Sequence, residues 1–280
     1  MAKKTQTCKR CSASFGIVGT QCPKCGFWNH AGTTMGPDET ILLSEVTEDE
    51  FSAIPSGPWD PCFSDKGGIV KTGVTLLAGA PGGGKSTMAL QLADCIAESQ
   101  KREVFLVGTE EAVKQIRARA IRLRLKNLHL IRVMPMGSGA DLGEALLVKK
   151  SDGTYRSCAF IIDSLNGLCG EDQQAAVELA TAAKDYAVRL DAPCILIGHV
   201  NKGEDFSGKM GLQHVVDTTI TLFPSFDEYR EMTTVKNRFG PAAVVVPLLM
   251  TKHRGLVATK FDEVPEDKDG EYDLENEDEA

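Results

Sequence analysis

A glycine-rich segment followed by a lysine and two hydroxyl side chains carries the clearest chemistry of this sequence. It follows an apolar run that begins at Val74 and precedes a helix-forming stretch, which predicts a strand, a loop and a helix in that order. Glycines let backbone N–H groups converge on phosphates, Lys85 reaches the β and γ phosphates, and Ser86 ligates magnesium. The pattern is a complete Walker A motif and predicts binding of ATP with Mg²⁺. Its candidate residues are Gly79, Pro81, Gly82, Gly83, Gly84, Lys85, Ser86 and Thr87.

Two further apolar runs end in carboxylates. Val104–Gly108 is followed by Glu110 and Glu111, and Ala159–Ile162 is followed by Asp163. Open α/β sheets bind ligands at the carboxyl ends of parallel strands, so we expect these side chains beside the Walker A loop. We predict that Asp163 holds magnesium through its water shell and that Glu110 polarises the attacking water. The alternatives are a helix-capping Asp163 and a Glu111 that complements a helix dipole.

A fourth apolar run, Cys194–Gly198, ends in polar side chains that we expect at the same edge. His199 or Asn201 is a candidate sensor of the γ-phosphate. The alternative for His199 is an ordinary hydrogen-bonded histidine at a strand end.

Four cysteines near the N-terminus have the spacing of a metal site. Cys8 and Cys11 form one C-x2-C pair, and Cys22 and Cys25 form a second pair after ten intervening residues. Zinc prefers tetrahedral coordination by thiolates, so we predict a structural zinc finger with all four positions filled. The segment is too short to bury a core, and metal coordination must supply its folding energy. A redox-active C-x2-C pair is the competing interpretation.

The other cysteines and the overall hydropathy indicate a cytoplasmic protein. Five single cysteines lie in apolar or helical stretches, where buried free thiols are expected: Cys62, Cys95, Cys158, Cys169 and Cys194. No run approaches the length of a membrane span, and the polar N-terminus has no apolar signal segment. We therefore expect neither a disulfide framework nor a membrane-bound protein, but a chain that acts in the cytoplasm of a bacterium or a phage-infected host.

The net charge of −8 is unevenly divided along the chain. Residues 262–280 contain eleven acidic residues and one lysine, which leaves residues 1–261 with a charge of +2. Residues 1–37 contain five basic residues and no acid, which suits a phosphate backbone as partner and equally suits a solvated basic arm. The acidic tail cannot fold alone; we expect it to be disordered and to provide solubility, with DNA mimicry or docking of a basic partner as alternatives.

Strands that alternate with helices must position these groups. We expect helices near 85–99, 112–126 and 172–190, and β-rich segments near 218–223, 231–236 and 243–250. This alternation predicts an α/β fold with a doubly wound, mostly parallel sheet and extra C-terminal strands. The expected domains are a zinc finger (1–33), a linker (34–56), an ATPase domain (57–261) and the acidic tail (262–280).

The order of these motifs resembles the RadA (Sms) family of bacterial recombination ATPases, which join a four-cysteine zinc finger to a RecA-like motor. The resemblance covers about 250 residues and is strongest at Lys236-Asn-Arg-Phe-Gly240, the signature pentapeptide of that family. It implies a RecA-like fold, a hexameric ring, and Lys236 and Arg238 acting as fingers on the nucleotide of the neighbouring subunit. Without the resemblance, the two residues would be interpreted as an ordinary charged turn.

The resemblance also places a DNA-binding loop between the fourth strand and the next helix. Lys202 and Lys209 are the candidate contacts to single-stranded DNA, mainly to phosphates and with strong salt dependence. A second basic surface, the helix face with Arg117, Arg119, Arg122 and Arg124, is interpreted as solvated helix surface, with contact to DNA or to a neighbouring subunit as the alternative.

The sequence departs from the family pattern at three places. The Lon-protease-like domain that usually follows is expected to be missing, Pro58-Trp-Asp-Pro61 replaces an acidic and basic run, and Gly83 replaces a bulky aliphatic residue. The resemblance implies a DNA-dependent ATPase with helicase or translocase activity that promotes recombination, branch migration or unwinding in DNA repair, with a recombinase as a further partner. The alternatives are a replicative helicase of a phage or mobile element and a nucleotide-switched mediator that does not move on DNA.

Overall fold

The computed structural model describes residues 5–7, 13–16, 24, 52–108, 111–135, 146–170, 172–199, 210–225 and 227–260. The chain divides into two compact units, Met1–Glu50 and Phe51–Ala280. In the first unit, strands β1 (Thr5–Thr7) and β2 (Ser14–Gly16) pair antiparallel, with Gln6 opposite Phe15. The chain between these strands contains Cys8 and Cys11, and all four predicted zinc ligands lie outside the described residues.

The second unit contains the remaining elements. Its helices are α1 (Lys85–Gln100), α2 (Val113–Arg122), α4 (Leu165–Cys169), α5 (Gln173–Leu190) and α6 (Met210–Val215), with 3₁₀ turns at Asp60–Cys62 and Leu128–Leu130. Its strands are β3 (Ala53–Ile54), β4 (Ile69–Val70), β5 (Val74–Gly79), β6 (Glu103–Gly108), β7 (Ile131–Pro135), β8 (Ser157–Asp163), β9 (Cys194–His199), β10 (Thr218–Pro224), β11 (Tyr229–Asn237), β12 (Val245–Thr251) and β13 (Gly255–Ala258).

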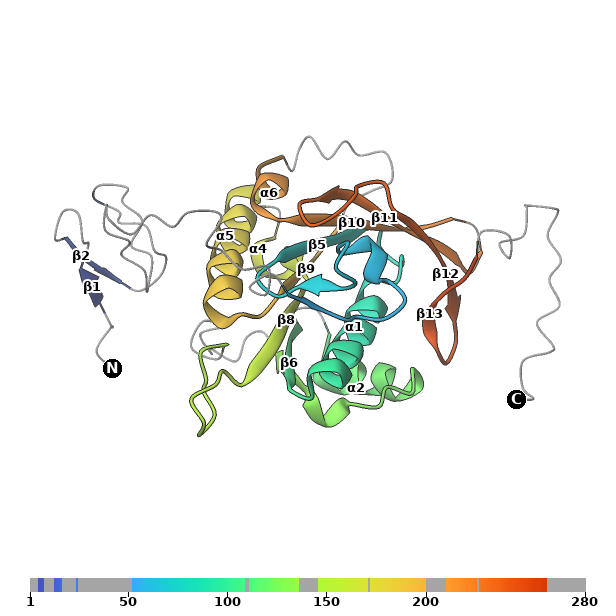
Figure 1. Ribbon diagram of the computed structural model, residues 1–280, viewed down its shortest axis with the longest axis horizontal. Coiled ribbons are helices and arrows are strands. Elements are labelled where there is room, and N and C mark those ends of the chain that lie inside the picture. The colour runs from blue at the N-terminus through green and yellow to red at the C-terminus, as the bar shows by residue number, and fades with distance from the viewer. Residues whose placement is uncertain are drawn as a thin grey trace. The chain divides into compact units, whose positions relative to one another are not determined.

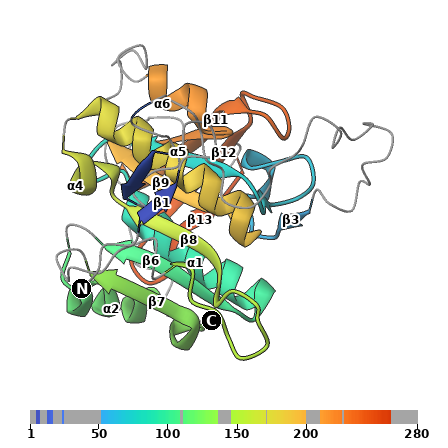
Figure 2. The same cartoon turned by 90° about the vertical axis from the view of Figure 1, so that its left-hand side faces the viewer.

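Strands β5 to β13 form one sheet in the described part of this unit, in the order β13-β12-β11-β10-β5-β9-β8-β6-β7. The strands from β10 to β7 are parallel, and β11, β12 and β13 extend the sheet as antiparallel strands. Figure 2 shows β6, β7 and β8 side by side at one end of this sheet. The predicted mostly parallel α/β sheet with extra C-terminal strands is therefore confirmed.

Apolar side chains alternate between two core layers, one on each face of the sheet. Leu77, Leu106 and Ile161 pack in the layer that contains residues of α1 and α2. Their neighbours along the strands, such as Leu76 and Ile162, pack in the layer that contains residues of α5 (Figure 1). Strands buried on both faces are typical of parallel sheets covered by helices on each side. None of the described helices combines the length and apolarity needed to cross a membrane.

The start of this unit differs from the predicted boundary. Strand β3 lies in the segment expected as linker, and it pairs with β4 through Ala53 opposite Val70. The departure Pro58-Trp-Asp-Pro61 forms the 3₁₀ turn with a buried Trp59, and Asp60 accepts hydrogen bonds from the backbone N–H and hydroxyl of Ser56. At this departure from the family pattern, Trp59 thus contributes its side chain to the core of the domain.

The five single cysteines have no disulfide partner, and Cys62, Cys158 and Cys194 are buried. Burial raises the pKa of the Cys95 and Cys158 thiols to about 11. The expectation of buried free thiols is therefore confirmed for Cys62, Cys158 and Cys194, whereas Cys95 and Cys169 are free but only partly buried.

Candidate functional site

The P-loop, residues 79–87, joins the end of β5 to the beginning of α1. The Lys85 side chain is buried in this loop, where its Nζ donates to the carbonyl oxygens of Gly79 (2.8 Å) and Ala80 (2.7 Å). Gly84 precedes the helix with φ of 97°, a left-handed conformation that favours glycine. The first backbone N–H groups of α1 have no partner within the helix, so this end can bind phosphate oxygens.

Close packing explains why glycine stands at position 83. A Cβ on Gly83 would lie 3.0 Å from the carbonyl oxygen of Leu222 in β10, and one on Gly84 would lie 2.6 Å from Cε of Met250 in β12. The P-loop is therefore pressed against the C-terminal strands. A side chain at position 83 would require the Leu222 backbone to shift by a few tenths of an ångström.

A pocket beside the P-loop brings together two of the predicted site residues, Ser86 and Asp163. Its lining residues are Ser86, Leu90, Leu106, Gly108, Glu111, Ile116, Arg119 and Asp163. Asp163 ends β8 directly beside Gly108 at the end of β6, as expected for parallel strands that share one sheet edge. Hydroxyl and carboxylate oxygens are the ligands that magnesium prefers, so Ser86 and Asp163 fit a magnesium site.

The neighbouring helix cap is not Asp163. The N-cap of α4 is Ser164, whose side chain accepts a hydrogen bond from the backbone N–H of Gly167. The capping alternative for Asp163 is therefore wrong. The carboxylate of Asp163 lines the pocket of Ser86 instead.

Glu111 and Arg119 form an ion pair in this pocket. Arg119 Nη2 donates to Glu111 Oε1, and Glu111 Oε2 is buried with no hydrogen-bond partner among the residues that the structure describes. The sequence interpretation treated Glu111 as a helix-dipole charge and Arg119 as solvated surface, and the placement of both in the pocket corrects it. The sequence did offer a signal for this ion pair, because Arg119 follows Glu111 by eight residues on the next predicted helix. Glu110, the predicted base, lies outside the described residues.

The other arginines of the basic helix face differ in whether they contact the rest of the protein. Arg122 Nη1 donates to the carbonyl oxygen of Lys252 in the β12–β13 turn at 2.7 Å. Arg117 and Arg124 are exposed, as expected for solvated helix surface. The face is thus only partly the solvated surface that the sequence indicated.

The end of β9 lies in the same sheet between β5 and β8. The backbone N–H of His199 donates to Asn166 Oδ1 of α4 at 3.1 Å, which fixes the strand end against that helix. Asn201 and the predicted DNA contacts Lys202 and Lys209 lie outside the described residues.

Lys236 and Arg238 are here called the cation pair. They lie at the edge of the sheet where the parallel strands begin, whereas the P-loop lies at the edge where these strands end. Strand β10 runs parallel to β5, with Thr218 beside Thr75, and antiparallel β11 places Lys236 opposite Thr219. The end of β11 therefore lies where β5 begins, whereas the P-loop follows the end of β5. The structure does not bring the cation pair to the P-loop of its own chain.

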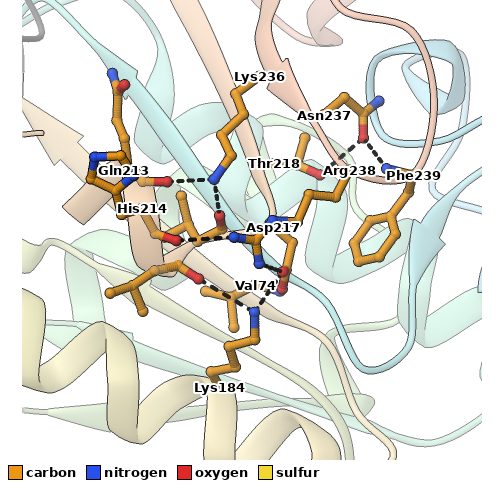
Figure 3. Close-up of polar contacts among 12 residues, drawn as sticks. Val74, Lys184, Gln213, His214, Asp217, Thr218, Lys236, Asn237, Arg238 and Phe239 are labelled. Carbon is orange, nitrogen blue, oxygen red and sulfur yellow. Dashed lines mark hydrogen bonds and ion pairs between the residues drawn. The ribbon is translucent and has the colours of Figure 1, made fainter. Parts of the chain in front are cut away.

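Figure 3 shows how the cation pair is held. Lys236 Nζ donates to the carbonyl oxygens of Gln213 and Val216, and Arg238 donates to Asp217 Oδ1 (2.9 Å) and to the carbonyl oxygen of His214 (3.1 Å). Burial, followed by the neighbouring charge of Arg238, lowers the pKa of Lys236. No catalytic motif in the sequence marks Asp217, whose carboxylate here accepts a hydrogen bond from the guanidinium of Arg238.

Comparison with known proteins agrees with this geometry. Residues 46–205 match the family model described as an AAA domain. The chain is 32% identical over 278 residues to the DNA repair protein RadA of Chlamydia pneumoniae, covering 89% of this chain and 58% of that protein. It is 33% identical over 273 residues to RadA of Mycobacterium tuberculosis strain H37Rv, covering 84% of this chain and 52% of that protein. The chain thus spans just over half the length of these relatives.

A solved structure has the same architecture. A KaiC-like protein from Pyrococcus horikoshii superposes with a TM-score of 0.61 and 17% identity, over 75% of this chain and all of that one. At this level of identity the likeness concerns the fold alone, a P-loop ATPase fold of the RecA and KaiC type.

Proposed function

The chain belongs to the RadA family and carries an AAA domain, and from this premise we propose that it is a motor that hydrolyses ATP and moves on single-stranded DNA during recombination and repair. The observation that carries the proposal is that the P-loop and the cation pair lie at opposite edges of the sheet. One edge bears the P-loop with the pocket of Ser86 and Asp163, and the other bears the cation pair.

The P-loop edge would hold the nucleotide. Backbone N–H groups of the loop and Lys85 bind the phosphates, and Ser86 with Asp163 holds magnesium. The metal ion, when bound, neutralises charge on the β and γ phosphates. Because Arg119 already engages one oxygen of Glu111, we keep Glu110 as the residue that orients the attacking water and give Glu111 a part in shaping the pocket. His199 stays a candidate phosphate sensor.

The opposite edge would serve a neighbouring copy. A contact between the P-loop edge of one copy and the cation edge of the next is heterologous, and such contacts close into rings when their rotation allows it. A cation supplied in trans stabilises charge in the transition state and makes hydrolysis depend on assembly. We propose a hexameric ring in which Lys236 and Arg238 reach the nucleotide of the next subunit.

DNA would enter through the segment that precedes α6. Lys202 and Lys209 lie in this segment and would contact phosphates, and a recombinase is the further partner that the family implies. For the first unit we propose a zinc site formed by Cys8, Cys11, Cys22 and Cys25, the first two of which lie between paired strands β1 and β2. About one zinc ion per chain by elemental analysis, lost when the cysteines are replaced by serine, would support this site.

The test of the motor is ATP hydrolysis measured with and without single-stranded DNA, for the intact chain and for Lys236→Ala. We expect DNA to stimulate the intact chain and not the variant, because the stimulated rate needs the cation of the neighbouring subunit. Lys150→Ala, at an exposed lysine in the hairpin that precedes β8, is the control and keeps the stimulated rate. Equal and feeble rates with and without DNA would contradict the motor and favour a binding protein that does not move.

A further inference from the structure

Asp217 is a buried carboxylate that connects three segments of the ATPase unit. Its Oδ1 accepts hydrogen bonds from Lys184 Nζ of α5 (2.7 Å) and Arg238 Nη1 (2.9 Å), and its Oδ2 accepts one from the backbone N–H of Val74 (3.1 Å). Its side chain is 5% exposed, whereas those of Lys184 and Arg238 are 35% and 46% exposed. A buried anion thus fixes two cations that reach the surface.

The carbonyl oxygens at the end of α6 complete this cluster. Lys236 donates to the carbonyls of Gln213 and Val216, Arg238 to that of His214, and Lys184 to that of Val215. The last carbonyls of a helix have no partner within it and attract positive charge. Four consecutive carbonyls at the end of α6 are therefore bound by the same cations that surround Asp217 (Figure 3).

Without Asp217 this arrangement would be unfavourable for the cations. The pKa of Lys236 is lowered first by burial and then by the charge of Arg238, and Lys184 lowers it further; Asp217 acts in the opposite direction. The backbone also depends on this residue, because the N–H of Asp217 donates to Val74 O (2.9 Å) and the N–H of Arg238 donates to Asp217 O (3.1 Å). Asp217 therefore offsets the repulsion among the three cations, and its carbonyl oxygen fixes the backbone from which the Arg238 side chain extends.

We propose that Asp217 is the positioning residue that holds Arg238, and through the shared helix end Lys236, in the orientation needed to reach the nucleotide of a neighbouring copy. This inference rests on the proposed function of the cation pair in trans. Asp217 itself does not touch nucleotide. It also ties the cation pair to the first residue of β5, the strand whose other end begins the P-loop.

The test uses Asp217→Asn in the full chain, because asparagine keeps the size and one acceptor oxygen but removes the negative charge. We expect kcat of DNA-stimulated ATP hydrolysis to fall about tenfold, since one charge-assisted contact to the finger is lost, with the KM for ATP and the Kd for DNA unchanged. Asp152→Asn is the matched control, because it makes the same change at an exposed carboxylate in the turn before β8, which contacts Thr154 and not the cation pair. It should keep kcat.

A double-mutant comparison separates positioning from a general structural role. If Asp217 acts mainly through Arg238, Asp217→Asn lowers kcat in the intact chain by a clearly larger factor than in the Arg238→Ala background, where only the effect through Lys236 is left. A purely structural residue would cost the same factor in both backgrounds, and that result would overturn the proposal. Asp217→Glu, which keeps the charge but moves it by one methylene, undergoes the same comparison if circular dichroism shows that the asparagine variant is unfolded.

The outcomes also separate this inference from the proposed function. If Lys236→Ala and Arg238→Ala leave the DNA-stimulated rate unchanged, the finger role fails, and the positioning role fails with it. If those two variants lose activity while both Asp217 variants keep it, only the positioning role is overturned.

Discussion

The two edges of the central sheet are built in different ways. The P-loop edge is made from one continuous segment, residues 79–87, in which Lys85 is buried against the carbonyls of its own loop. The opposite edge is assembled from α5, α6, β10 and β11, which supply Lys184, the helix carbonyls, Asp217 and the cation pair. There the cations are partly exposed around a buried carboxylate.

In our proposal, the P-loop edge receives phosphate and the edge with the cation pair reaches toward it. A helix N-terminus with converging N–H groups accepts an anion from outside. Half-exposed cations held from behind by a carboxylate can approach an anion on another molecule. The two edges lie at opposite ends of the strands, and we propose that they meet between copies of the chain.

The largest expected effect is at the P-loop edge. Lys85→Ala should lower ATP hydrolysis roughly a thousandfold or more, with or without DNA, because it removes the charge that reaches the β and γ phosphates. Steady-state phosphate release measures this effect. Lys71→Ala serves as the control, since Lys71 precedes the same strand and pairs with Asp191 at 3.7 Å. Substantial activity in Lys85→Ala would contradict the proposal that the P-loop edge binds the phosphates of ATP.

A smaller effect should distinguish the adjacent carboxylates within the P-loop edge. We expect Glu110→Gln to lower kcat about a hundredfold and Glu111→Gln about tenfold, because Glu111 is already engaged by Arg119. Single-turnover hydrolysis with prebound ATP checks both variants. If Glu111→Gln is the more severe, Glu111 is the base, and the assignment of Glu110 is wrong.

The anchoring of the P-loop helix should affect stability without affecting chemistry. Gln91 of α1 donates to the carbonyls of Arg254 and Leu256 and accepts from the N–H of Leu256, all at 2.9–3.0 Å. Gln91→Leu leaves these buried backbone groups unpaired and should lower the free energy of unfolding by about 2–3 kcal/mol. Urea unfolding measures the loss. Gln100→Leu at the end of the same helix should change stability far less, and an equal loss in both would contradict the anchor.

Much of the fold could be predicted from the sequence because short apolar runs and glycines mark most of its strands and turns. The apolar runs and glycines predicted β5, β6, β8, β9 and the P-loop, and helices α1 and α5 lie where they were expected. Helix α2 ends at Arg122 rather than near 126, because Arg124 has φ of 55° and turns the chain. Strand β7 was not identified: it is five residues long, contains Arg132 and ends in a proline at the sheet edge.

The candidate site was predictable only where a local motif marks its residues. Ser86 belongs to the Walker A motif and Asp163 ends an apolar strand, whereas the roles of Arg119 and Asp217 depend on partners that the fold brings from other elements. Lys184 carries no signal in the sequence, because a lysine in an amphipathic helix is usually solvated. Only the tertiary structure shows that it shares a buried carboxylate with Arg238.

The most direct test of complementary edges mixes two inactive variants. Lys85→Ala keeps the cation pair but lacks a working P-loop, and Lys236→Ala keeps the P-loop but lacks a working finger. In randomly mixed rings about a quarter of the interfaces join an intact P-loop to an intact finger, so we predict that ATP hydrolysis with DNA recovers to about a quarter of the intact rate. A mixture that hydrolyses ATP no faster than the average of the two separate variants would contradict catalysis across copies.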